Sequence, residues 1–133
     1  MYKARKHWSL GLIVLFLLGA CSSVKVKSVE ELNNARAIYE EALKLVAGAE
    51  YSKAIEYFQF VVKNFPGAAD EKYVSMSTYE IGFSHYRNGD DEKAIEYFDK
   101  VLAHSKTRRA RVLASLVKTK IQRGDGYKNT SYN

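Results

Sequence analysis

The chain has 133 residues, of which 47% are hydrophobic and 27% charged, a composition typical of a globular protein and unlike that of a disordered one. Its formal net charge is +6, from 21 basic and 15 acidic side chains, and three of the basic side chains lie within the first six residues. The remaining charge is too small to indicate nucleic-acid binding, and the single cysteine excludes an intramolecular disulfide.

The first twenty residues have the pattern of a cleavable export signal. Lys3, Arg5 and Lys6 give a positive start, and Leu10–Leu18 is an apolar run without a charge. A membrane-spanning helix needs about 20 apolar residues, so this run is too short to span a bilayer comfortably, whereas its length suits a signal peptide. We therefore expect residues 1–20 to be a signal peptide. An ordinary signal peptide with a chance cysteine, or an inserted N-terminus, is the alternative.

The end of the apolar run, Leu18–Cys21, reads Leu-Gly-Ala-Cys and resembles the lipobox of bacterial lipoprotein precursors. The resemblance implies cleavage between Ala20 and Cys21 and attachment of a diacylglyceryl group to the cysteine sulfur. Several acyl chains hold a protein at a membrane effectively permanently. Ser22 follows, where an aspartate would retain an enterobacterial lipoprotein in the inner membrane, so we expect a lipid anchor in the outer membrane and a domain facing the periplasm. Residues 21–28 are predicted to be the lipidated tether.

A six-residue string occurs twice, 40 residues apart, and indicates an internal repeat. Lys53–Phe58 and Lys93–Phe98 both read Lys-Ala-Ile-Glu-Tyr-Phe. In both copies the apolar residues recur at helical spacing on one face. A second amphipathic pattern precedes each string, and Gly89-Asp90 has the glycine that commonly ends one helix and the acidic residue that begins the next. The predicted unit is a helix, a tight turn and a second helix.

The residues Ile81-Gly82, Gly89-Asp90, Ala94 and Phe98 resemble the consensus of the tetratricopeptide repeat. The resemblance implies that Gly82 and Ala94 lie where the two helices of one unit make close contact. The spacing of 40 residues exceeds the family's 34, and Gly67–Glu71 is predicted to take up the excess as a longer loop.

A partial third unit follows the two complete ones. Thr107–Arg123 has a helical pattern, Gly124-Asp125 repeats the turn signal, and residues 127–133 are a polar tail. We predict an all-α fold, a short α-solenoid of about two and a half tetratricopeptide repeats over residues 29–126. Its five helices are expected at approximately 29–47, 51–65, 70–88, 91–105 and 107–123.

No cluster in the sequence indicates catalysis or metal binding. His85 and His104 are predicted on different helices, and neither has acidic or cysteine neighbours placed to complete a metal site. The acidic run Asp90–Glu92 is explained by a helix start, where the helix dipole favours negative charge. Phosphate-binding loops and nucleophile motifs are absent from the sequence. We therefore expect no enzyme, catalytic residue, metal, other cofactor or small-molecule substrate, and export makes nucleic acid an unsuitable partner.

The segment His104–Arg123 contains seven basic residues and no acidic one. A solvated outer face of the last helix is the simplest interpretation. Contact with an acidic protein or with anionic lipid headgroups is the alternative, because clustered basic side chains attract both.

In tetratricopeptide arrays the first helix of each unit lines a concave groove, and the resemblance implies the groove positions of this chain. We expect Tyr79, Phe83 and Tyr86 to be partly exposed there, although their spacing also suits a core. Aromatic and arginine side chains together are typical of binding hot spots. The predicted partner groove consists of Arg36, Tyr39, Tyr79, Phe83, Tyr86, Arg87, Arg111 and Lys118, with Leu43 and Met76 at matching helical positions.

The phrase Val62–Pro66, read with the lipobox and the repeats, resembles two bacterial envelope families. One is the BamD-like lipoproteins of the outer-membrane β-barrel assembly machinery, and the other is the YbgF-like periplasmic proteins of the Tol-Pal system. The first resemblance implies an adaptor that holds an envelope protein, such as a barrel assembly protein with POTRA domains. That family is much longer than this chain, and the second is usually not lipidated. A Tol-Pal, cell-wall or division-linked factor and a periplasmic chaperone are the alternatives.

Overall fold

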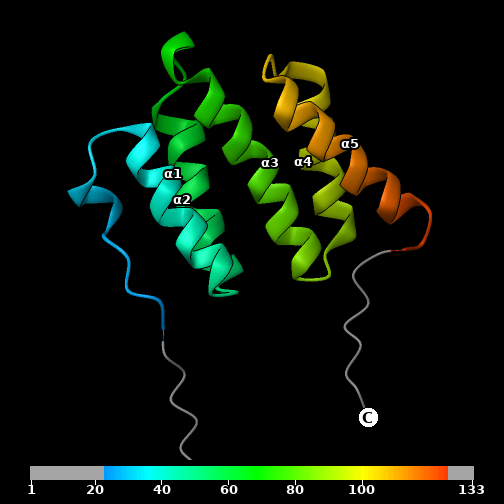
Figure 1. The fold of residues 1–133 in the computed structure, drawn as a ribbon, viewed down its shortest axis with the longest axis horizontal. Helices are drawn as coiled ribbons and strands as arrows, with labels where there is room; N and C mark the ends of the chain where they lie inside the picture. Colours follow the sequence, from blue (N-terminus) through cyan, green and yellow to red (C-terminus); the bar gives the residue numbers. More distant parts are fainter. Residues whose placement is uncertain (1–22, 126–133) are drawn as a thin grey trace, which may run out of the picture.

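The computed structural model describes residues 23–125, which form five α-helices and two short 3-10 helices (Figure 1). The predicted signal peptide, Cys21 and the polar tail lie outside these residues. No strand occurs between residues 23 and 125, so the all-α prediction is confirmed. The elements are η1 (Val29–Glu31), α1 (Ala35–Ala47), α2 (Tyr51–Asn64), η2 (Ala68–Asp70), α3 (Glu71–Arg87), α4 (Asp91–His104) and α5 (Arg108–Gln122).

The helices stack side by side in chain order (Figure 1). Each helix packs on the next, and α3 also contacts α1 and α5. Helices α1 and α2 form one helix–turn–helix unit, α3 and α4 form the second, and α5 follows as a single helix. This arrangement confirms the predicted short solenoid of tetratricopeptide-type units.

One type of turn ends α1, α3 and α5. After α3, the Asp90 N–H donates a hydrogen bond to the His85 carbonyl at 2.9 Å, and equivalent bonds close the other two turns. This is the Schellman motif, which places one residue at positive φ. Gly89 has φ of 81° and Gly124 has φ of 77°, but the same position in the first turn is Ala49, with φ of 59°.

Four of the five helices agree with the predicted bounds to within one residue, but α1 begins at Ala35 and not at residue 29. The Asn34 side chain accepts a hydrogen bond from the Ala37 N–H at 2.8 Å, which caps the helix at this point. Before it, Leu32 is extended, with φ of −112° and ψ of 128°. The predicted start was wrong because a local cap overrode the helical pattern upstream.

Residues 23–32, here called the strap, run along α1 and α2 on the side away from α3 (Figure 1). The Val24 N–H donates to Glu50 Oε1 at 2.5 Å, and the Val24 side chain lies against Gly48 in the first turn. The apolar side chains of the strap, namely Val24, Val26, Val29 and Leu32, pack against the core of the first unit. The described part of the predicted tether is therefore packed onto the domain.

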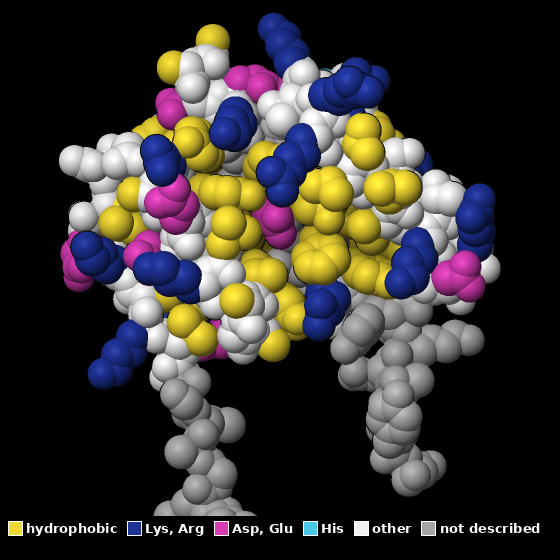
Figure 2. All heavy atoms as spheres, in the orientation of Figure 1, with side chains coloured by type: hydrophobic (Ala, Val, Ile, Leu, Met, Phe, Trp, Pro, Cys, Tyr) yellow, Lys and Arg dark blue, Asp and Glu magenta, His cyan; other side chains and the backbone are white. Residues whose placement is uncertain are grey.

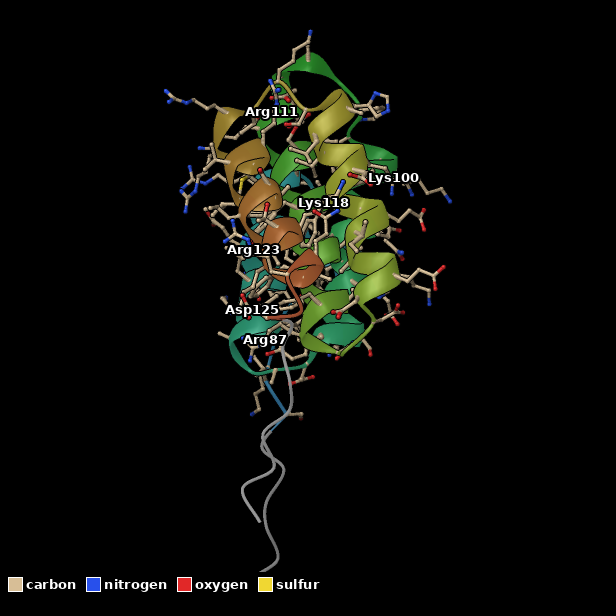
Figure 3. The ribbon with its side chains drawn as sticks, turned by 90° about the vertical axis from the view of Figure 1, so that its right-hand side faces the viewer. Arg87, Lys100, Arg111, Lys118, Arg123 and Asp125 are labelled. Atoms are coloured by element: carbon tan, nitrogen blue, oxygen red, sulfur yellow. The ribbon has the colours of Figure 1, made fainter. Side chains whose placement is uncertain are left out.

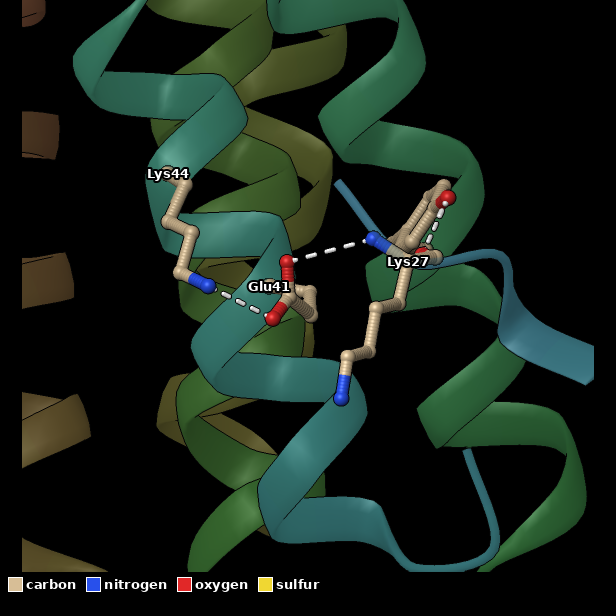
Figure 4. A network of polar contacts seen from close by, with 4 residues as sticks. Lys27, Glu41 and Lys44 are labelled. Atoms are coloured by element: carbon tan, nitrogen blue, oxygen red, sulfur yellow. Dashed lines mark hydrogen bonds and ion pairs between the residues drawn. The ribbon is translucent and has the colours of Figure 1, made fainter. Parts of the chain in front are cut away.

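A network around Glu41 holds the middle of the strap (Figure 4). Its carboxylate accepts hydrogen bonds from Lys44 Nζ at 2.6 Å and from the Lys27 N–H at 3.4 Å. The Lys44 contact is the main reason why the pKa of Glu41 lies below its ordinary value. On the other side of the strap, the Tyr57 hydroxyl donates to the Lys27 carbonyl at 2.9 Å.

Helix α3 is the centre of the core, because neighbouring helices cover it on several sides. Its Ile81 belongs to the cluster of the first unit, whereas Met76, Tyr79 and Tyr86 belong to the cluster formed with α4 and α5. The predicted close contact at Gly82 is confirmed, since a Cβ there would stand 2.9 Å from Phe98 of α4. Ala94 is likewise fully buried.

Glu71 joins the start of α3 to the loop between α4 and α5. Its carboxylate accepts hydrogen bonds from Thr107 Oγ1 at 2.6 Å, Ser75 Oγ at 2.7 Å and the Lys106 N–H at 2.8 Å. The Thr107 hydrogen bond is the main cause that holds the pKa of this carboxyl below its ordinary value. The loop that positions α5 is therefore fixed by a residue 35 positions earlier in the chain.

We predict that Ala49→Gly stabilises the protein by up to about 1 kcal/mol. A left-handed conformation costs an L-residue such as Ala49 roughly 1–2 kcal/mol, and glycine avoids this cost. Glycine loses more backbone entropy on folding than alanine does, but this loss is smaller than the strain that the substitution removes. Gly89→Ala, at the same place in the second turn, should destabilise by a similar amount. Urea unfolding followed by circular dichroism measures both. Destabilisation by Ala49→Gly would contradict the left-handed assignment of the first turn.

Candidate functional site

An open hollow of about 520 Å³ lies between α1, α3 and α5, and we call it the groove. Hydrophobic side chains gather over the middle of this face of the molecule, with lysine and arginine side chains around them (Figure 2). The lining residues are Arg36, Tyr39, Glu40 and Leu43 of α1, Lys72, Tyr73 and Met76 of α3, Thr107 and Arg109.

Helical spacing explains how α1 contributes to the groove. Arg36, Tyr39, Glu40 and Leu43 are three, four and seven residues apart, so they share one face of the helix. The Tyr39 ring packs on Tyr73 of α3 at 5.9 Å between ring centres, which closes the floor between the two helices. Burial raises the pKa of Tyr39 to about 12, so its hydroxyl is neutral at ordinary pH.

The rim of the groove is mainly basic. Arg36 Nε pairs with Glu40 at 2.7 Å, and this is an exposed pair that adds little stability. Lys72 and Arg109 are also exposed, and neither makes an ion pair within residues 23–125. The groove therefore presents tyrosine and methionine side chains between unpaired positive charges.

Glu80 lies close to this site, and the sequence analysis did not include it. It is four residues after Met76 on α3 and therefore lies on the same helical face. Burial raises its pKa to about 7, and Arg109 of α5 lowers it in part. Extending the helical stripe from Met76 to Phe83 through Glu80 would have identified it from the sequence.

Two of the aromatic groove predictions are wrong in their exposure. Tyr79 is 7% exposed and Tyr86 is 4% exposed, so both belong to the core, whereas Phe83 is half-buried. Aromatic side chains on both faces of a helix need two surfaces to be buried, and we expected a solenoid of two units to offer only one. In the structure α2 and α4 cover α3 extensively, and α5 covers part of the face that carries Tyr79, whose ring lies 5.8 Å from Phe98.

The predicted basic residues of α5 lie away from the groove. Arg111 lines a separate hollow beside Leu102, and Lys118 pairs with Asp99 of α4 (Figure 3). Arg109 occupies the groove instead, two residues before Arg111. Because each residue turns a helix by about 100°, a shift of two residues in the assumed register moves a side chain to nearly the opposite face.

Arg87 lies at the end of α3 over the first residue of α2. Its Cζ is 5.2 Å from the centre of the Tyr51 ring and 5.9 Å from that of Phe83. These contacts place Arg87 beyond the residues that line the groove. The structure therefore brings four predicted positions together at the groove, namely Arg36, Tyr39, Leu43 and Met76. The residues that the sequence pattern did not indicate are Glu40, Lys72, Tyr73, Thr107 and Arg109, with Glu80 close by.

Within residues 23–125 no three metal-ligating side chains cluster, and none of the helices found there has the length and apolar character needed to span a membrane.

Residues 77–105 match the tetratricopeptide repeat. This segment contains most of α3 and all of α4, so the match falls on the second helix–turn–helix unit. A curated relative is the photosystem I assembly protein Ycf3 of Rippkaea orientalis (strain PCC 8801 / RF-1), which is 33% identical over 61 residues. The aligned part is 46% of this chain and 34% of that protein, so the chain covers only about a third of the relative's length. No solved structure matches the chain significantly.

We predict that Glu80→Gln stabilises the protein in a pH-dependent manner. Well below pH 4.5, the ordinary pKa of this group, Glu80 is protonated in both states and the substitution should have little effect. As the pH rises towards 7, the unfolded chain releases this proton while the folded protein retains it, so wild-type stability falls relative to the variant. The difference should reach about 1–3 kcal/mol above pH 7.

Comparing melting temperatures of the variant and wild type at each pH cancels the titration of the other carboxyl groups. Arg109→Ala provides the complementary test, because removal of the neighbouring positive charge should raise the pKa of Glu80 further and lower stability at pH 8. A difference between Glu80→Gln and wild type that does not change with pH would contradict the buried, proton-retaining carboxyl.

Proposed function

We propose that this protein is a non-enzymatic adaptor that captures a segment of a partner protein in the groove between α1, α3 and α5. The observation that carries the proposal is the combination, in one open hollow, of tyrosine and methionine side chains with a basic rim. The tetratricopeptide match supports it, because solenoids of this type form extended concave binding surfaces.

The charge of the groove defines the partner segment. Lys72 of α3, Arg109 of α5 and Arg36 of α1 are exposed positive groups that line the groove together with its apolar side chains. Desolvated arginine and aromatic side chains account for most of the energy of many interfaces. A segment with apolar side chains flanked by aspartate or glutamate fits this surface.

We further propose that the adaptor acts in a bacterial cell envelope, anchored through a lipid on Cys21 to the outer membrane and facing the periplasm. The lipobox-like Leu18–Cys21 is the support for this placement. A part in outer-membrane β-barrel assembly, as in BamD-like lipoproteins, with a POTRA-bearing partner, is the more specific form of the proposal. A Tol-Pal or cell-wall-linked factor and a client-binding chaperone are the other forms.

The relative's name, a photosystem I assembly protein, supports only the general part of the proposal. Assistance in assembling other proteins is a property that an adaptor with a peptide-binding groove can provide. The photosystem named for that relative describes that protein, and we do not propose it as the partner of this chain.

Lys72→Glu with Arg109→Glu should abolish partner capture, because it reverses two positive charges of the groove. Both side chains are exposed, so the variant should remain folded although it loses the positive charge near Glu80, and circular dichroism checks this. A photo-crosslinking residue at Tyr73 reports the partner in cells, and mass spectrometry identifies it. The control pair, Lys53→Glu with Lys63→Glu, makes the same charge change at exposed positions of α2 and should leave the crosslink intact. An undiminished crosslink in the groove variant would place the binding surface elsewhere.

Cys21→Ala should prevent lipidation and leave an unprocessed or mislocalised precursor, because the acyl acceptor is the cysteine sulfur. Mass spectrometry of the protein from its native host measures the N-terminus and any acyl mass. An unmodified Cys21 in a membrane-associated wild-type protein would refute the lipid anchor, and it would leave the groove proposal to stand or fall by the crosslinking result.

A further inference from the structure

The outward face of α5 is the feature of this solenoid that the groove does not use. Ala110, Ala114 and Ile121 of α5 are buried against the preceding unit. On the opposite side, Val112 is 49% exposed and Leu116 is 62% exposed, and these are the exposed large hydrophobic residues among residues 23–125. The terminal faces of solenoids are normally polar, because an apolar end lowers solubility.

This face has the form of a helix-packing surface. It borders a hollow of about 670 Å³ lined by Leu102 of α4 and by α5. Val112 and Leu116 are four residues apart, and the small Ser115 lies beside them. Gly82 has the corresponding role in α3, where a small residue allows Phe98 of α4 to approach closely.

The fold shows what kind of element packs at such a place. Helices α1 and α3 each end in a Schellman turn that leads into the second helix of the unit. Helix α5 ends in the same turn, closed by the hydrogen bond from the Asp125 N–H to the Lys120 carbonyl at 3.1 Å. Within residues 23–125, no second helix follows it.

Three positive charges around this face have no ion-pair partner in the described part of the chain. Lys106, Arg108 and Arg111 line the hollow, and none of them makes an ion pair with another residue between 23 and 125. The nearby carboxylate of Asp99 on α4 is already paired with Lys118. The surface therefore favours an acidic occupant.

We propose that the end face of α4 and α5 is a second docking surface, which binds an amphipathic helix of a partner protein whose apolar stripe is flanked by acidic residues. The bound helix covers Leu102, Val112 and Leu116 and takes the place of the second helix of the third unit. Its carboxylates approach Arg108 and Arg111. This second docking surface is separate from the groove, and the proposal does not depend on the function proposed for the groove.

A second copy of the chain fits this face less well. A symmetric dimer would place Lys106, Arg108 and Arg111 of one copy against the same residues of the other, which repel. An anionic lipid surface would satisfy the charges, but it does not account for the hollow beside Ser115 or for the repeat-type turn that ends α5. An acidic helix accounts for all three.

The test uses a labelled synthetic peptide with the sequence Asp90–His104, which is the chain's own second-helix pattern and carries five acidic and two lysine residues. Fluorescence anisotropy with the purified full-length chain measures its dissociation constant. Leu116→Asp should raise this constant by at least about tenfold, and Arg111→Glu by several-fold. Lys53→Glu makes the same charge change at an exposed position of α2, outside both the groove and this face, and should have little effect.

Three results would overturn the proposal. The first is no binding of the peptide, or binding that Leu116→Asp leaves unchanged. The second is a wild-type dimer in analytical ultracentrifugation that Leu116→Asp converts to a monomer, since the face would then join two copies. The third is cosedimentation of the chain with phosphatidylglycerol vesicles that Leu116→Asp abolishes, since the face would then bind lipid. In this assay the chain with and the chain without Leu116→Asp both carry Cys21→Ala.

Discussion

The close approach of α3 and α4 at Gly82 is the contact on which the rest of the fold depends. Phe98 of α4 is fully buried, and it lies so near to Gly82 that any side chain at that position would displace it. Ser77 and Ser84 are also fully buried on α3, so small side chains allow other helices to come close on its remaining sides. Overpacking at such a position typically costs about 1–3 kcal/mol. A central helix with small residues is what permits five short helices to pack together, because α3 contributes to both hydrophobic clusters.

This central position of α3 also determines where the groove can form. Once α2, α4 and part of α5 cover the helix, the side that is left to face the space between α1 and α5 carries Lys72, Tyr73 and Met76, with Glu80 and Phe83 further along the same stripe. A carboxyl group at this place is desolvated, which is why it holds its proton near neutral pH. The groove is thus apolar at its floor, and its lasting charges are those of the rim. A single feature of packing explains both the shape of the site and its electrostatic character.

The repeated string and the turn glycines were sufficient to predict the helices and their pairing, because these features are local or recur within one unit. The contact at Gly82 was implied by the resemblance to the tetratricopeptide repeat. The groove was harder to predict. Which α5 residues line the groove depends on the rotation of this helix about its axis. The prediction took that rotation from the distance to the turn glycine, but α5 has two more residues between its groove position and Gly124 than α3 has between Met76 and Gly89. Arg111 was therefore predicted where Arg109 lies. The burial of Tyr79 depends on how many neighbours surround α3, which the pattern of one helix does not contain.

The packed strap has a consequence for how far the domain can move. The chain is already fixed to the domain at Val24, where its N–H reaches Glu50. Three residues of extended chain span roughly 10 Å, so a lipid on Cys21 would hold Val24, and with it the near side of the first unit, within about that distance of the bilayer. Such a short tether would restrict the encounter of the domain with its partners to a thin layer next to the membrane. Confinement of this kind raises the effective concentration of any partner anchored in the same membrane, and a partner in solution gains nothing from it.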